Sequence, residues 1–114
     1  MHELSIALSM IEQVEREAEK NGGGTVETVY VRIGVLSGVD AQALQFAYEL
    51  ACEGSQLQGS RLEIESVRLL VHCRHCDATH SPDLQNLLCP RCLTGEQEIL
   101  EGRELEVTAL ELAA

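Results

Sequence analysis

Four of the five cysteines stand in two pairs with two residues between the members of each pair, which is typical of a metal site. Cys73 and Cys76 form one pair, and Cys89 and Cys92 form the other. Each spacing lets one tight turn present two sulfur atoms to a single ion, and Pro90 stiffens the second turn by fixing φ. Two such turns complete a tetrahedron of thiolates. The spacing therefore predicts a structural Zn(II) site, because four protein ligands leave no position for a catalytic water.

Two other kinds of site use similar cysteine pairs. A rubredoxin-like iron centre is normally screened by aromatic residues, yet none occurs between Arg61 and the C-terminus. A nucleic-acid-binding zinc ribbon needs a basic surface with interleaved aromatic residues, and only Arg74 and Arg91 lie close to the cysteines. The fifth cysteine, Cys52, lies in an apolar helical pattern, which indicates a buried and unreactive thiol.

Three histidines flank the cysteine pairs: His72, His75 and His80. They are either exposed to solvent or hydrogen-bonded around the site, or else they exchange with the cysteines as ligands of the metal. Their spacing does not decide between these roles.

A second group of metal donors stands at the start of the sequence. The α-amine of Met1, the amide nitrogen of His2 and the His2 imidazole can close two fused chelate rings on one ion. Nitrogen donors in a plane favour Ni(II) or Cu(II) over zinc. Such a site needs a further ligand, and a carboxylate such as that of Glu3 supplies one.

Chain length nominates Asp40 as another carboxylate. A first helix of about 18 residues carries the chain about 27 Å away from His2, and a strand of about ten residues returns it by about 33 Å. Asp40 therefore ends near the start of the first helix, where anionic ligands offset the positive end of the helix dipole. The residues alone leave a simpler interpretation open, in which His2 is inert and Asp40 only caps the next helix.

The apolar patterns predict the elements that position these donors. Residues 1–20 favour a helix with Leu4, Leu8, Ile11, Val14 and Ala18 on its apolar face. Glycines at 22–24 end it, and residues 25–36 alternate as a strand. A turn at 37–40 leads to a helix at about 41–53, whose inward residues are expected to be Leu44, Ala47, Leu50 and Ala51. Residues 61–71 predict one strand with a shift in its apolar parity, which a bulge or burial of both faces explains. The cysteine segment follows, and a closing strand with another parity shift contains Leu105, Val107, Leu110 and Leu112.

This order predicts an α+β fold in which two helices cover one face of a small mixed three-stranded sheet. A zinc-ribbon-like module is inserted before the closing strand. We assign residues 1–69 and 98–114 to an α+β domain that carries the candidate N-terminal metal site, which becomes a nickel-binding domain under the resemblance described below. Residues 70–97 form the structural zinc module, which we expect to be disordered without metal.

Composition excludes several classes of function. The 114 residues carry a net charge of −11, which opposes binding to nucleic acid or anionic lipid. No apolar run reaches the length of a membrane span, and the first residues lack the pattern of a secretory signal. We therefore expect a cytoplasmic protein, in which paired cysteines hold metal rather than disulfides. The sequence shows no recognisable pattern of a nucleophile and a base, so we do not expect an enzyme.

The metal-binding residues and their flanking sequence together resemble a known family. The chain is similar to the hydrogenase nickel-incorporation proteins of the HypA/HybF type in Met1-His2-Glu3, the helix behind it, Val31–Ser37, both cysteine pairs and Gly102-Arg103-Glu104-Leu105. This resemblance implies a nickel metallochaperone for [NiFe]-hydrogenase maturation. It maps nickel ligation onto His2 with Glu3 as a neighbour, implicates Asp40, and maps zinc onto the four paired cysteines.

The resemblance also implies protein partners, namely a nickel-handling GTPase of the HypB type and the hydrogenase large-subunit precursor. A weak homodimer is compatible with it, and some relatives serve urease. It assigns no role to His75 or His80. The competing function is a zinc-stapled interaction module that recruits maturation partners without carrying nickel.

Overall fold

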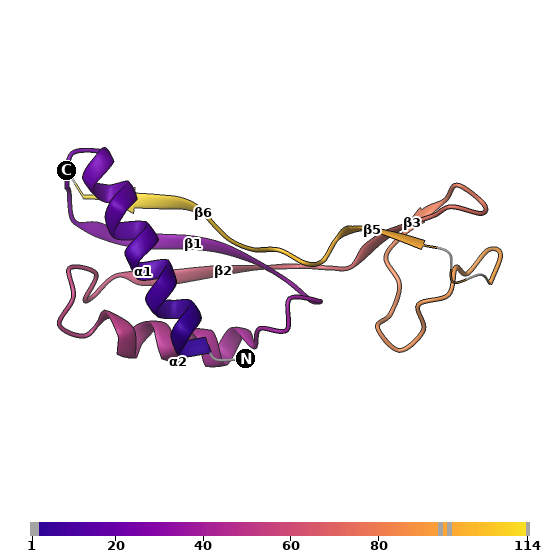
Figure 1. Cartoon of the computed structure of the whole chain (residues 1–114), viewed down its shortest axis with the longest axis horizontal. Helices are drawn as coiled ribbons and strands as arrows, with labels where there is room; N and C mark the ends of the chain where they lie inside the picture. Colours follow the sequence, from indigo (N-terminus) through magenta and orange to yellow (C-terminus); the bar gives the residue numbers. More distant parts are fainter. Residues whose placement is uncertain (1–2, 94, 96, 114) are drawn as a thin grey trace.

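The structure is a computed structural model that describes residues 3–93, 95 and 97–113. The chain forms an elongated molecule of 53 × 25 × 16 Å, with both helices at one end and the cysteine segment at the other (Figure 1). Its elements are α1 (Glu3–Lys20), β1 (Val26–Gly34), α2 (Ala41–Cys52), β2 (Arg61–Val67), β3 (Leu70–Cys73), β4 (Thr79–His80), β5 (Gln97–Glu101) and β6 (Leu105–Leu112).

The first sheet has the strand order β2-β1-β6, with β2 parallel and β6 antiparallel to β1. This arrangement confirms the predicted mixed three-stranded sheet. The parity shift in the closing strand is a bulge, because Tyr30 faces Ala109 whereas the next residue, Val31, faces Val107. Thr108 is the extra residue, and it lets Val107 and Leu110 both pack against the core.

The core lies between this sheet and the two helices, and α1 crosses in front of β1 and β2 (Figure 1). Val29, Val31 and Ile33 of β1 are buried beneath them. On the other face, Tyr30 and Arg32 bond to the carboxylates of neighbouring strands. That face is polar and can face water, so the fold has two layers, with both helices on the opposite face of the sheet.

The predicted inward faces of the helices are wrong in part. Leu4 and Leu8 of α1 are 48% and 50% exposed, and Leu50 of α2 is 47% exposed. Apolar residues three and four apart outline two overlapping stripes on each helix, and the sheet covers only one of them. The buried side chains are Ile6, Ala7, Met10, Ile11, Val14 and Ala18 in α1, and Leu44, Ala47, Tyr48 and Cys52 in α2.

The single strand predicted over residues 61–71 is also wrong. It is divided into β2, which pairs with β1, and β3, which pairs with β4 and β5 in the second sheet. The break falls at residues 68–69 because the register of β1 ends with Gly34 opposite Val67; the next N–H, of Val35, still donates to the Val67 carbonyl, but that of Leu36 turns to Gly102. Val67, Leu69 and Val71 are nevertheless all buried, so the alternation continues across the break.

Two glycines touch where the chain passes between the sheets. A Cβ atom on Gly34 would lie 2.1 Å from the carbonyl carbon of Gly102, and Gly102 itself has φ +129°. The N–H groups of Gly34 and Leu36 donate to the carbonyls of Glu104 and Gly102, at 2.8 and 2.7 Å. Only glycine permits this approach of two backbones.

The cysteine segment contains a small sheet of its own, with the order β4-β3-β5. It fits the predicted zinc-ribbon-like module, although the sequence pattern indicated neither β4 nor β5. Among the described residues, no helix has the length and apolar character needed to cross a membrane.

Candidate metal centre

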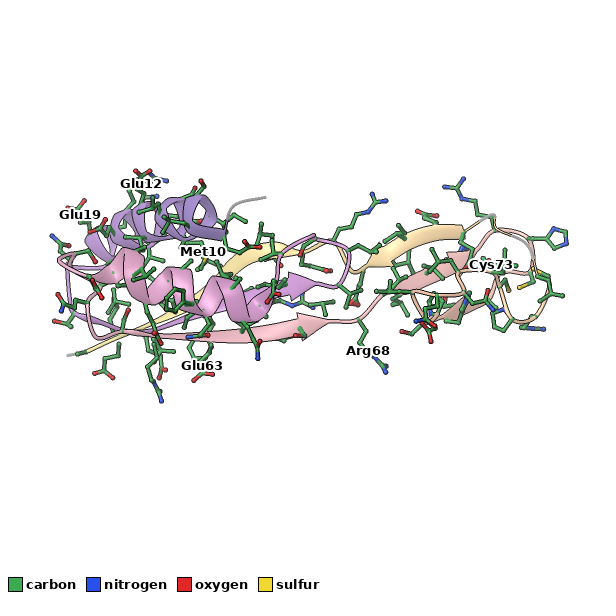
Figure 2. The ribbon with its side chains drawn as sticks, turned by 90° about the horizontal axis from the view of Figure 1, so that it is seen from below. Met10, Glu12, Glu19, Glu63, Arg68 and Cys73 are labelled. Atoms are coloured by element: carbon green, nitrogen blue, oxygen red, sulfur yellow. The ribbon has the colours of Figure 1, made fainter. Side chains whose placement is uncertain are left out.

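The four paired cysteines gather at the end of the molecule opposite the helices (Figure 2, Cys73). Cys73 ends β3, and the other three lie in the turns that follow. All four sulfur atoms lie within 4.8 Å of one another. Cys73 and Cys89 are fully buried, whereas Cys76 and Cys92 are half-buried. The predicted cysteines therefore come together within reach of one ion.

Both cysteine pairs sit on the same local backbone structure. The N–H of Asp77 donates to the carbonyl of Cys73, and the N–H of Leu93 donates to the carbonyl of Cys89, each at 2.8 Å. Asp77 and Leu93 have φ values of +62° and +59°, in the left-handed region that non-glycine residues rarely adopt. The same strained turn is thus built twice, and it directs two sulfur atoms of each pair towards one point.

The separations of the sulfur atoms test which group this site fits. They are 3.4 Å between Cys73 and Cys92 and 3.5 Å between Cys76 and Cys89, much longer than a disulfide bond of about 2.05 Å. A zinc ion with bonds of about 2.3 Å places its tetrahedral sulfur ligands about 3.8 Å apart. The four thiols therefore fit a tetrahedral ion with a small outward adjustment.

The thiols differ in acidity without a metal. The backbone N–H groups of Cys92 and Arg91 lower the pKa of Cys89 by stabilising its thiolate. The N–H at Ala78 also lowers the pKa of Cys76, but burial and the neighbouring sulfur atoms outweigh it and raise that pKa to about 11. Without metal, Cys76 therefore retains its proton near neutral pH, and loading a divalent ion must release that proton.

The three histidines take different positions around this centre. The Nε2 atom of His72 lies 2.6 Å from a carboxylate oxygen of Asp77, so it supports the first turn. His75 is exposed. Both ring nitrogens of His80 are buried with no hydrogen-bond partner in the described structure. None of the three belongs to the group of potential ligands found among the described residues.

The second predicted site is described only in part, because Met1 and His2 lie outside the described residues. Glu3 begins α1, and its carboxylate accepts a hydrogen bond from the backbone N–H of Asp40 at 3.4 Å. The strand therefore returns the chain to the start of the first helix, as the length argument predicted. The Glu3 carboxylate and the backbone of Asp40 therefore meet at the point where the chain enters α1.

Asp40 also caps α2. Its Oδ1 atom accepts the N–H groups of Gln42 and Ala43 at 2.9 and 3.1 Å. Within the described part of the chain no hydrogen bond engages Oδ2, so one carboxylate oxygen remains available. The capping role and a ligand role therefore use different atoms.

Sequence reasoning did not find the polar group around Cys52. This thiol is buried as predicted, and it lies 4.0 Å from the hydroxyl of Ser60, which is 2.6 Å from that of Tyr48. Burial raises the pKa of Cys52 despite both hydroxyl groups. Tyr48 and Ser60 lie twelve residues apart, so helix periodicity alone gives no sign of their pairing.

Comparisons with known proteins agree on one family. Residues 1–112 match the family described as hydrogenase/urease nickel incorporation, metallochaperone, hypA. Two similar proteins are both named hydrogenase maturation factor HypA. The one from Roseiflexus sp. (strain RS-1) is 46% identical over 97% of this chain and 91% of its own length. The one from Chloroflexus aurantiacus (strain ATCC 29366 / DSM 635 / J-10-fl) is 42% identical over 97% and 98%.

Solved structures give the same result. The solution structure of the Ni metallochaperone HypA from Helicobacter pylori is 30% identical, with a TM-score of 0.70 over 100% of this chain and 99% of that one. A second solution structure, of HypA protein, has a TM-score of 0.74 at 30% identity over 99% and 97%. These descriptions name a metallochaperone rather than an enzyme, which agrees with the lack of a catalytic pattern. The chain belongs to the HypA family of nickel-incorporation metallochaperones that act in hydrogenase maturation.

Proposed function

We propose that this chain carries Ni(II) at its N-terminus and delivers it to a [NiFe]-hydrogenase during maturation. The ligands in this proposal are the His2 imidazole, nearby backbone nitrogens and the carboxylates of Glu3 and Asp40, with the Met1 amine as a further donor. The observation that carries it is the hydrogen bond from the backbone N–H of Asp40 to the carboxylate of Glu3, which brings two acidic residues that are distant in the sequence together beside the start of α1.

The electrostatics at this point support a loosely held cation. The N-terminus of α1 is the positive end of its dipole and repels a metal ion, whereas the two carboxylates offset that repulsion. The balance favours moderate affinity, which a carrier needs in order to release its cargo. Because imidazole binds metal only when neutral and titrates near pH 6.5, acidification should release nickel.

Zinc has a structural role in this proposal. A Zn(II) ion would cross-link the loops that carry its ligands and would take part in no reaction. The ligands are Cys73, Cys76, Cys89 and Cys92. We keep the division into a nickel-binding domain (1–69 and 98–114) and a zinc module (70–97) as part of the proposal.

Delivery takes place in protein complexes. The partners in this proposal are a nickel-handling GTPase of the HypB type and the hydrogenase large-subunit precursor, all in the cytoplasm. A weak homodimer is part of it too. The alternative function is a zinc-stapled scaffold that recruits these partners without carrying nickel. The exposed apolar residues of both helices favour partner binding, which the carrier and the scaffold both require.

Nickel titration of zinc-loaded protein with a native N-terminus tests the carrier function. We expect one nickel site per chain, and His2→Ala should weaken binding by about tenfold or more. Asp40→Asn is the informative partner variant, because an asparagine still caps α2 but offers no charged ligand. We expect it to weaken nickel binding and leave the thermal midpoint of unfolding nearly unchanged.

Two controls define what would overturn the proposal. Glu49→Gln alters an exposed carboxylate on α2 outside the proposed site and should leave nickel binding unchanged. Extension of the N-terminus by two residues removes the Met1 amine from the chelate and retains His2. Equal nickel affinity of the parent and His2→Ala contradicts the site, and maturation in cells that survives His2→Ala but not Cys73→Ser favours the scaffold.

A further inference from the structure

The turn that follows α1 contains the only asparagine–glycine sequence of the chain, Asn21-Gly22. It lies at the end of the molecule away from the cysteine segment (Figure 1), and both of its residues are exposed. An asparagine before a glycine can modify itself, because the next backbone nitrogen can attack the side-chain amide carbon and close a five-membered ring. A side chain on the second residue hinders that attack, and glycine has none. Neither metal site uses this turn.

The space around this turn is open. A Cβ atom built on Gly22 would meet no atom of the described residues within 4 Å, and Gly22 has φ +98°. Asn21 also borders a hollow of about 400 Å³ between α1 and β6, which leaves room for water beside its side chain. The fold therefore obstructs neither the attacking nitrogen nor the water that later opens the ring.

The attacking nitrogen is the most loosely bonded backbone group of the turn. The N–H of Gly22 donates to the carbonyl of Glu19 at 3.3 Å, whereas the N–H of Gly23 donates to the carbonyl of Ala18 at 2.8 Å. Hydrogen bonds from N–H to oxygen usually span about 2.7–3.2 Å, so the bond at Gly22 is a weak one. Because the nitrogen must leave this bond before it attacks, the weak bond lowers the cost of that step.

We propose that Asn21 is a site of spontaneous deamidation in the folded protein. The Gly22 nitrogen loses its proton to water and forms a bond to Cγ of Asn21, while the bond from Cγ to Nδ2 breaks and Nδ2 leaves as ammonia. Water then opens the cyclic imide at either carbonyl. Opening at Cγ gives aspartate, and opening at the backbone carbonyl gives isoaspartate, in which the chain runs through the side chain. The net reaction consumes one water and releases one ammonia.

The products fit the end of the helix less well than asparagine does. Nδ2 of Asn21 donates to the carbonyl of Glu17 at 2.7 Å, and a carboxylate has no hydrogen to donate there. The new charge lies at the negative end of the α1 dipole beside Glu17 and Glu19, and Lys20 is already paired with Glu17 at 3.5 Å. Isoaspartate also lengthens the backbone by one carbon. Deamidation therefore loosens the last turn of α1 and leaves its first turn, at the proposed nickel site, unaffected.

Peptide mapping by mass spectrometry of the zinc-loaded full chain, sampled while it ages at neutral pH, tests the proposal. The other asparagine of the chain, Asn86, is an internal control, because it is also exposed but is followed by Leu87. We expect aspartate and isoaspartate to accumulate at position 21 while Asn86 stays intact. Isoaspartate is the decisive product, because direct hydrolysis of the amide cannot form it. Equal conversion at both positions, or aspartate at position 21 without isoaspartate, overturns the proposal.

Variants test the ring and its consequence separately. Asn21→Gln keeps an amide but must close a six-membered ring, so we expect its modification at position 21 to stop. Asn21→Asp should lower the thermal midpoint of unfolding by about 2–5 °C, whereas Asn86→Asp adds the same charge outside both helices and should not. Nickel binding by Asn21→Asp should equal that of the parent, which keeps this test apart from the carrier function. Continued modification in Asn21→Gln overturns the ring, and an unchanged midpoint in Asn21→Asp overturns the loosening of α1.

Discussion

At the scale of single residues, the five cysteines fall into two environments that differ in purpose. Four of them face one another in paired turns, with backbone N–H groups beside Cys89 that favour its thiolate. Cys52 lies instead against Tyr48 and Ser60 in the core, where burial disfavours the charged form. Thiolates are the reactive and metal-binding species. The same side chain therefore serves as a ligand at one end of the molecule and as packing at the other.

Thiol labelling checks this difference. At pH 8 and without denaturant, chelation of the zinc should release four reactive thiols, because the cysteine segment unfolds without its metal. Cys52 should stay protected, because its pKa is raised and its side chain is 4% exposed in the core. Denaturant should then release the fifth. The Cys52→Ala variant is the control and should lose only the slow thiol. Five thiols that react together after chelation would contradict the separate environments.

Residue types also show how far the sequence determines a site. The cysteine pairs could be predicted because each ligand pair is local, and two residues of spacing already impose the turn. The proximity of Asp40 to Glu3 followed from helix and strand lengths alone. The left-handed conformation of Leu93 could not be predicted, since leucine rarely adopts it, and that of Asp77 is favoured only relative to other non-glycine residues.

At the scale of elements, the position of each strand depends on where its partner ends. The apolar pattern continues from Val67 through Val71, so nothing in it marks the passage from one sheet to the next. That passage is fixed by Gly34, where β1 ends and the backbone meets Gly102. Leu50 was misplaced for a related reason, because periodicity gives an apolar stripe but not which part of it the sheet covers. The break between β2 and β3 and the buried face of α2 therefore depend on long-range pairing, which the local apolar pattern does not show.

The contact between the two glycines leads to a prediction for Gly34→Ala. The added Cβ would overlap the carbonyl group of Gly102, and backbone cannot rotate away as a side chain does. We expect a loss of about 3 kcal/mol in the free energy of unfolding, measured with urea. Gly95→Ala is the control, because its added Cβ would meet only a flexible side-chain carbon of Leu88 at 3.8 Å among the described residues. Equal stability of Gly34→Ala and the parent would show that the strands separate easily.

At the scale of the whole molecule, the two ends depend on different sources of stability. The helical end has a core of buried aliphatic side chains that includes Val14, Val29 and Leu44. The cysteine end exposes several of its leucines and buries Cys73 and Cys89 instead. A segment with so little apolar burial needs its metal in order to fold.

Removal of zinc should therefore affect the ends unequally. We expect hydrogen exchange in β3, β4 and β5 to accelerate to nearly unfolded rates, while amides of β1 and α1 stay protected. The helical signal at 222 nm should remain largely unchanged, because both helices lie outside the cysteine segment. A cooperative loss of the helical signal on chelation would show instead that the two ends unfold as one unit.

The strand order of the first sheet has a consequence for biosynthesis. β1 is central in that sheet, yet its antiparallel neighbour β6 is the last element of the chain and follows the whole cysteine segment. During translation the ribosome must therefore finish the sulfur-bearing loops before the helical half can close. An emerging chain keeps an open β1 edge until then, and a stop codon between Cys92 and β5 leaves each sheet without its last strand.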